Sequence, residues 1–162
     1  MEKTINKLNS VSYTGNVKIE LFNGKRKLQQ YCTHNTGKQR LFDFLANCLV
    51  GNFNAAKSAM PCRVACFNNE DKLVSKYVYY DSAAVDRTTN GKDGTLVIYR
   101  FRIPYTCLIA GGTIKKVALY SNNDQQNKYA EDEIPEIPIP SSGGNFTIAI
   151  EWTMTITNGS KN

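Results

Sequence analysis

The single histidine and the cysteines are the residues of this chain best suited to metal binding or nucleophilic catalysis. Cys32 and His34 are two positions apart, so both side chains point to one face if this segment is a strand. Cys62 and Cys66 would have to complete a zinc site, but their spacing is unusual for structural zinc. A nucleophilic cysteine would need His34 as its base and a third orienting group. Nothing in the chain resembles a cysteine-enzyme signature, so we expect no metal, no cofactor and no enzymatic activity.

Four carboxylates form an acidic run near the middle of the second half of the chain. They are Glu131, Asp132, Glu133 and Glu136. Paired carboxylates serve as acid and base only in a rigid, partly desolvated pocket that separates their pKa values. This run lies in a proline-rich segment, so we expect a solvated charge run or a salt-bridging surface for a basic neighbour.

Tyrosines and arginines between residues 77 and 102 are typical of an aromatic and basic binding face. The set is Tyr77, Tyr79, Tyr80, Tyr99, Arg100 and Arg102. Such faces bind single-stranded nucleic acid or sugars, but tyrosine is also common in sheet cores and at protein interfaces. We expect core or interface roles, and we keep carbohydrate or receptor binding through Tyr77, Tyr79 or Tyr80 as an alternative.

Positive charge is concentrated in the first half of the chain, whose net charge overall is +6. Residues 1–80 hold 12 Lys and Arg against 5 Asp and Glu, which is +7, and residues 81–162 hold 8 against 9, which is −1. A basic half can contact nucleic acid or an acidic partner. A solvated basic surface is the simpler interpretation, so we do not expect nucleic acid as a partner.

The first half of the chain predicts a hairpin and one helix. Val17–Phe22 alternates apolar and polar residues, and Asn23-Gly24 after it is a strong hairpin signal. The return strand, 25–33, begins with the cations Lys25, Arg26 and Lys27, which we expect at an exposed tip. Thr36 is a good N-cap for a helix to Val50, followed by Gly51 as C′ residue. Its stripe of Phe42, Leu45, Ala46 and Leu49 should pack on a sheet.

The rest of the chain predicts further strands. They are 63–67, 73–80, 95–103, 113–120 and 146–157. The last is the cleanest, because six large apolar side chains from Phe146 to Ile156 fall on one face and fix its register. We therefore predict a mainly β, antiparallel β-sandwich (jelly-roll or Ig-like) of about 7–8 strands, with one short helix near residues 37–50.

The predicted domain is a single β-sandwich over residues 1–162. It has an N-terminal arm, 1–12, and an extended loop, 121–144, that contains alternating proline and isoleucine. In that loop we expect an edge segment with docked isoleucines, and Ile137 and Ile139 are candidate interface residues.

The cysteine count and the N-terminus indicate where the protein is made. The five cysteines are Cys32, Cys48, Cys62, Cys66 and Cys107, an odd number with no CxxC pair. Residues 1–12 have no apolar core of a signal peptide, and no stretch approaches the length of a membrane span. We expect synthesis in a reducing cytoplasm, free and mostly buried thiols, and no membrane partner.

Four segments carry a pattern that resembles a known family. They are the N-terminal hairpin with the helix start Asn-Thr-Gly-Lys-Gln-Arg-Leu-Phe-Asp-Phe-Leu at 35–45, Pro-Cys-Arg-Val-Ala at 61–65, Gly-Thr-Ile-Lys-Lys-Val-Ala-Leu-Tyr-Ser at 112–121, and Phe-Thr-Ile-Ala-Ile-Glu-Trp-Thr-Met-Thr-Ile at 146–156. Over residues 17–157 the chain resembles small structural proteins of tailed bacteriophages that are often encoded among tail and fibre genes. The chain departs from that pattern at 134–140. Its free cysteines and its Asn- and Tyr-rich composition are similar to proteins of crAss-like phages of gut bacteria.

The resemblance implies a role in assembly of the virion and carries over no catalytic residues. It implies a structural component of the tail, collar or fibre-attachment region, or alternatively a decoration protein on the capsid surface. The expected partners are other phage structural proteins and further copies of this chain in a symmetric assembly. The candidate contacts are Lys25, Arg26, Lys27, Glu131, Asp132, Glu133, Glu136, Ile137 and Ile139, because opposite charges in the two halves suit head-to-tail packing around a ring.

Overall fold

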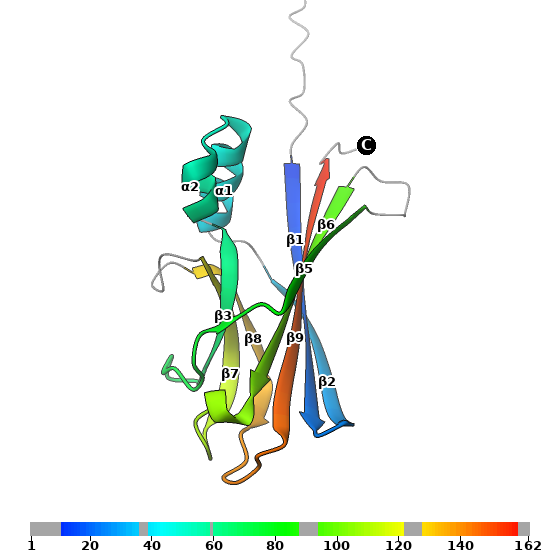
Figure 1. The fold of residues 1–162 in the computed structure, drawn as a ribbon, viewed down its shortest axis with the longest axis vertical. Coiled ribbons are helices and arrows are strands. Elements are labelled where there is room, and N and C mark those ends of the chain that lie inside the picture. The colour runs from blue at the N-terminus through cyan, green and yellow to red at the C-terminus, as the bar shows by residue number, and fades with distance from the viewer. Residues whose placement is uncertain (1–10, 36–38, 59, 88–93, 122–127, 159–162) are drawn as a thin grey trace, which may run out of the picture.

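The computed structural model describes residues 11–35, 39–58, 60–87, 94–121 and 128–158. Nine strands form two antiparallel sheets, as Figure 1 shows. The five-stranded sheet has the order β2 (Arg26–Asn35), β1 (Val11–Asn23), β9 (Phe146–Asn158), β6 (Gly94–Pro104) and β5 (Ser82–Arg87). The four-stranded sheet has the order β4 (Val78–Tyr79), β3 (Pro61–Phe67), β7 (Thr113–Ser121) and β8 (Lys128–Pro138). The prediction of a mainly β, two-sheet sandwich is confirmed.

Strand β9 is the centre of the five-stranded sheet. It pairs with β1 along one side and with β6 along the other. Five of its six predicted core residues, from Phe146 to Met154, are buried, and Ile156 is partly buried. Trp152 lies opposite both Val17 and Tyr99 and is fully buried. The alternation therefore predicted both the register of this strand and its central place.

The core lies between the two sheets. The five-stranded sheet contributes Trp152, Phe101 and Ile19, and the four-stranded sheet contributes Leu119 and Ile134 among others. On β6 the buried Phe101 alternates with the exposed Arg100 and Arg102, so that part of the outer face is open to solvent. On the outer face of the four-stranded sheet, Ala65, Phe67, Ala118 and Tyr120 form a second buried cluster, against which Tyr77 packs.

The hairpin formed by β1 and β2 turns at the predicted place. Gly24 has a φ of +59°, a conformation that glycine adopts without steric cost. Its backbone N–H donates to the carbonyl oxygen of Asn145 at 2.9 Å, which ties the turn to the start of β9. Lys25, Arg26 and Lys27 are exposed at this end of the molecule, as predicted.

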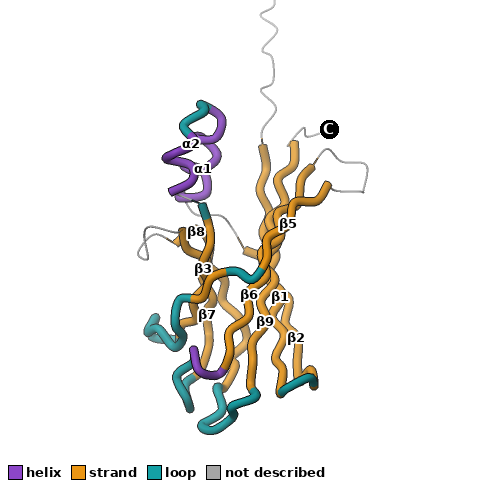
Figure 2. Tube along the Cα trace, viewed as in Figure 1, coloured by secondary structure: helices purple, strands orange, loops and turns teal. Residues whose placement is uncertain are grey.

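The predicted helix is α1, Gln39–Leu49, and a second helix, α2, Phe53–Ser58, follows it. Both lie at one end of the molecule, where β1 begins and β9 ends (Figure 2). Gly51 has a φ of +74° just after α1, which confirms the predicted helix stop. The predicted cap, Thr36, lies outside the described residues.

The predicted apolar stripe of α1 is only partly correct. Phe44 and Leu45 pack against the core, and the Phe44 ring meets Tyr129 of β8 edge-on at 6.2 Å between centroids. Ala46 and Leu49 are exposed instead of packed. The helix contacts the sandwich at its edge, so only part of the stripe finds a sheet to cover it.

Strand β8 replaces part of the loop predicted over 121–144 and confirms the expected edge segment with docked isoleucines. Lys128–Pro138 forms the edge of the four-stranded sheet, where a proline can be accommodated because the outer N–H groups need no partner. Ile137 and Ile139 are 1% and 3% exposed and belong to the core. The proposal that they face a partner is therefore wrong.

Three other segments differ from the prediction. Residues 82–87 form β5 and residues 53–58 form α2, although the sequence predicted loops for both segments. The predicted strand at 73–80 is mostly irregular, with only Val78–Tyr79 in a ladder and two isolated bridges, at Leu73 and Ser75. The alternation in 73–80 reflects packing of single residues against the core, as Val74 shows, and not a continuous ladder.

Candidate functional site

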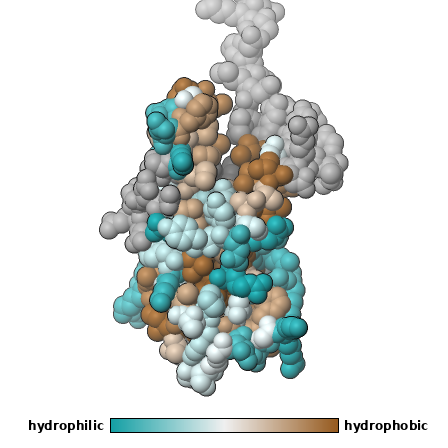
Figure 3. Space-filling model, viewed as in Figure 1, coloured by the Kyte–Doolittle hydropathy of each residue, from teal (hydrophilic) through white to brown (hydrophobic). Residues whose placement is uncertain are grey.

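The largest departure from an ordinary surface is a group of exposed apolar side chains at the helical end. Leu49 is 86% exposed, Val50 78% and Phe53 69%, all at the junction of α1 and α2. Val85 of β5 is 73% exposed. We call these four residues the apolar end. Figure 3 shows apolar surface gathered on the helices and beside the upper ends of the five-stranded sheet.

Val85 is exposed because the five-stranded sheet extends beyond its partner sheet. Val85 lies opposite Val97 on β6, and Val97 lies opposite Met154 on β9. Met154 is buried in the core, so Val85 belongs to the same inward face. This face continues past the shorter four-stranded sheet and is left uncovered there. Val85 lies apart from the helices, whereas Leu49, Val50 and Phe53 are gathered at the junction of α1 and α2, and an exposed apolar group of this kind marks an interaction surface.

The basic tip, Lys25, Arg26 and Lys27, lies on the turn between β1 and β2, at the opposite end from the helices (Figure 1). Lys27 pairs with Glu20 of β1 at 2.5 Å between Nζ and Oε1. Lys25 and Arg26 form no ion pair with any residue that the structure describes. The tip therefore presents two unpaired cations.

The acidic run is divided between structural and exposed residues. Glu131 pairs with Lys128 at 2.8 Å, and Asp132 accepts a hydrogen bond from the hydroxyl of Thr33 on β2. This bond joins the two sheets at their common edge, and burial raises the pKa of the Asp132 carboxyl. Glu133 and Glu136 are exposed. Only these last two have the accessibility that a charged contact requires.

The four tyrosines do not form one binding face with the arginines. Tyr99 is buried, and burial raises its pKa to about 12. Tyr80 packs against it at 5.5 Å, and Tyr77 packs edge-on against Tyr120 at 5.2 Å. Tyr79 is exposed, but its ring already holds the guanidinium of Arg63 at 4.7 Å. Three of the four therefore serve packing within the molecule.

The cysteines and the histidine are distributed over separate surfaces. Cys32 and His34 are exposed on β2, where Nδ1 of His34 donates to Oδ1 of Asn16. Cys62 and Cys66 are buried on β3. The part of the chain that the structure describes holds no group of three His, Cys, Asp or Glu side chains placed to bind a metal.

The two classes of thiol are expected to differ sharply in reactivity. Burial raises the pKa of Cys66 from its ordinary 9.0 to about 12, which lowers its thiolate fraction near pH 8 about a thousandfold. A disulfide-exchange reagent at pH 8 should therefore modify exposed Cys32 in minutes and leave Cys66 unmodified, as read by peptide mass spectrometry. The protein unfolded in urea is the control, where both thiols should react alike. Equal rates in the folded protein would contradict this burial.

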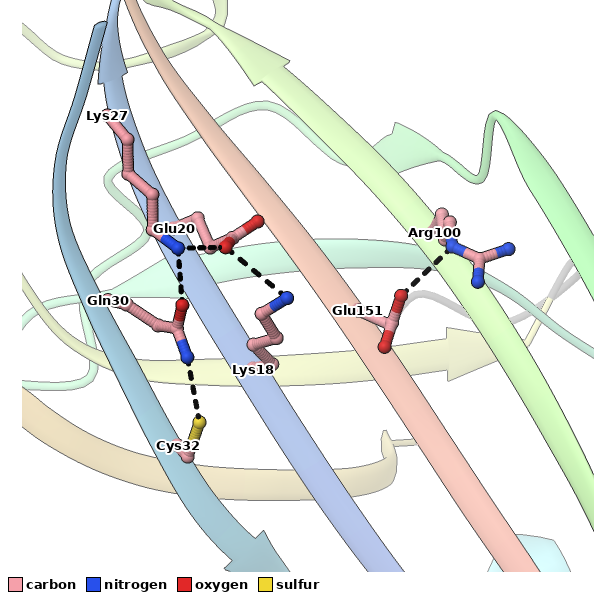
Figure 4. Close-up of polar contacts among 7 residues, drawn as sticks. All are labelled: Lys18, Glu20, Lys27, Gln30, Cys32, Arg100 and Glu151. Atoms are coloured by element: carbon pink, nitrogen blue, oxygen red, sulfur yellow. Dashed lines mark hydrogen bonds and ion pairs between the residues drawn. The ribbon is translucent and has the colours of Figure 1, made fainter.

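The outer face of the five-stranded sheet carries a charged row of three residues in register across the strands, Lys18 of β1, Glu151 of β9 and Arg100 of β6 (Figure 4). Cys32 of β2 and Ser82 of β5 lie at the two ends of this row. Nε of Arg100 donates to Glu151 at 2.9 Å, and Glu20 lies between Lys18 at 3.3 Å and Lys27 at 2.5 Å. The hydrogen bond from Lys27, with a smaller effect of Lys18, lowers the pKa of the Glu20 carboxyl. Exposed cross-strand pairs of this kind contribute modestly to sheet stability.

Comparisons of the chain with protein-family models, with curated proteins and with solved structures found no match. The resemblance to tailed-phage structural proteins therefore stays a prediction from the sequence. Within the described residues, no helix has the length and apolar character needed to cross a membrane.

Proposed function

We propose that this protein is a structural component of a tailed-phage particle that acts by protein–protein assembly. The observation that carries the assembly role is the apolar end. Leu49, Val50, Phe53 and Val85 are each more than two-thirds exposed, and the first three are gathered at the junction of α1 and α2. Monomeric proteins rarely leave several large apolar groups exposed together. Burial of such residues against a neighbour is the usual source of affinity at interfaces.

We further infer that exposed charges of opposite sign contribute to the contacts between subunits. The basic tip lies at the end opposite the helices, and Glu133 and Glu136 are exposed on β8. Unlike surfaces that meet in a heterologous contact produce a ring when the rotation closes. The placement in the tail, collar or fibre-attachment region rests on the sequence resemblance, with decoration of the capsid surface as the alternative.

Cryo-electron microscopy of the intact particle, with this chain traced in the density, tests the proposal. We expect the chain at a symmetric ring or lattice position, with the apolar end buried against a neighbouring subunit. The copy number then separates tail, collar and capsid surface. The proposal fails if purified particles lack the chain, or if the apolar end faces solvent in them.

A further inference from the structure

The outer face of the five-stranded sheet is hollowed next to its charged row. The hollow has a volume of about 350 Å³ and is open to solvent. Its walls include Glu20, Phe22, Asp81, Ser82 and Arg102, and Ala149 lies between them. The paired Arg100 and Glu151 of the charged row also border it. None of these residues has a part in the assembly surface proposed above.

The hollow follows from the strand register. Glu20 of β1, Ala149 of β9 and Arg102 of β6 lie side by side in one row. Neighbouring strands are about 4.8 Å apart, so Glu20 and Arg102 are separated by roughly 10 Å. Ala149 is too small to fill that space, and Glu20 pairs with Lys18 and Lys27 and not with Arg102.

One wall of the hollow is formed by the residues at the start of β5. Ser82 lies opposite Arg100, and the backbone N–H of Asp81 donates to the carbonyl oxygen of Arg100 at 2.7 Å. Strand β5 therefore covers β6 only from Arg100 toward its start, and Arg102 lies at an uncovered edge of the sheet. Asp81 and Ser82 lie at one side of the hollow, while the half-buried ring of Phe22 borders another side.

Two charged groups in the hollow have no partner among the described residues. The neighbouring charges Arg100, Glu151 and Glu20 are held in the ion pairs of Figure 4. The side chains of Arg102 and Asp81, by contrast, form no ion pair or hydrogen bond within the described part of the chain. One guanidinium and one carboxylate are thus free to bind a ligand, on either side of an apolar floor.

We propose that this hollow binds a sugar residue that carries a carboxylate, of the uronic acid type. The Arg102 guanidinium matches a carboxylate in a two-pronged geometry. The Asp81 carboxylate can accept hydrogen bonds from ring hydroxyls, and the Ser82 hydroxyl can donate to them or accept from them. Ala149 and Phe22 can contact the apolar face of the sugar ring. Asp81 disfavours any anion, so a sugar whose ring hydroxyls donate hydrogen bonds to Asp81 suits the hollow better than a sulfate ion. The proposal does not rest on the role in the virion.

Titration of the isotope-labelled full-length protein with digalacturonic acid, followed by NMR, tests the proposal. We expect shifts centred on the amides of Ala149, Arg102 and Asp81, with a Kd of about 1 mM, as for a small exposed site. R102Q should weaken binding at least tenfold. A149L should abolish binding without any change of charge, because leucine fills the hollow. R26Q is the matched control on the basic tip and should bind like the unaltered protein.

Several outcomes would overturn the proposal. One is the absence of shifts around Ala149, and another is equal weakening by R26Q and R102Q, which would indicate attraction by net charge only. Equal binding of neutral galactobiose would show that the sugar carboxylate does not contribute to affinity. Competition by inorganic phosphate at the same concentration would show an anion site without preference for sugar. Thermal unfolding of each variant confirms the fold, and the readout is independent of particle assembly.

Discussion

Replacement of Trp152 by alanine is expected to lower the free energy of unfolding by about 3–5 kcal/mol. Trp152 is fully buried in the central strand, between Val17 and Tyr99. The small side chain would leave a cavity in the middle of the core, which the two packed sheets can only partly close. Chemical denaturation in urea, followed by circular dichroism, measures the change as a lower transition midpoint.

Two further variants make this prediction specific. T153A, one residue along the strand and on the outer face, should change stability by no more than about 0.5 kcal/mol. W152F should cost less than W152A, because it keeps much of the volume and because Nε1 of Trp152 has no hydrogen-bond partner among the described residues. A cost below about 1 kcal/mol for W152A would show that β9 is not the centre of the core.

The parts of the fold that follow from local pattern were predictable. The alternation from Phe146 to Ile156 predicted β9 and its inward face, and Asn23-Gly24 predicted the turn of the hairpin. Gly51 predicted the end of α1. In each case the signal lies within a few residues, and the same residues determine the conformation.

The missed elements depend on contacts with distant residues. Strand β5 has little apolar alternation of its own, and it is held by its ladder with β6 from Ser82–Arg100 to Arg87–Thr95. Strand β8 contains prolines that argue against a strand, but its place at a sheet edge tolerates them. Ile137 and Ile139 were predicted as interface residues because a sequence pattern does not distinguish an apolar side chain in the core from one at a contact with a partner protein.

The candidate sites depend on tertiary structure even more strongly. Leu49 belongs to a helical stripe that predicted packing, yet it is exposed because α1 meets only the edge of the sandwich. The hollow at Ala149 exists because residues of β1, β9 and β6 come into one row, although they are far apart in the chain. Arg102 was recognised from the sequence as an outward cation, but its unpaired state is visible only in the fold.

Replacement of both Leu49 and Phe53 by serine is expected to reduce incorporation of the protein into particles at least a hundredfold. Burial of each side chain against a neighbour would contribute about 1.5–3 kcal/mol, and a loss of 1.4 kcal/mol lowers affinity about tenfold. Stability of the isolated protein should change little, because both side chains are already exposed to water. Complementation of a phage that lacks the gene, with quantitative mass spectrometry of purified particles, measures the incorporated fraction. I109S is the matched control, since Ile109 is also an exposed large apolar residue but lies in the turn before β7, outside the proposed contacts. Normal incorporation of the double variant would remove the apolar end from the assembly surface, and a loss of more than about 1 kcal/mol of stability would assign these side chains to the protein's own fold.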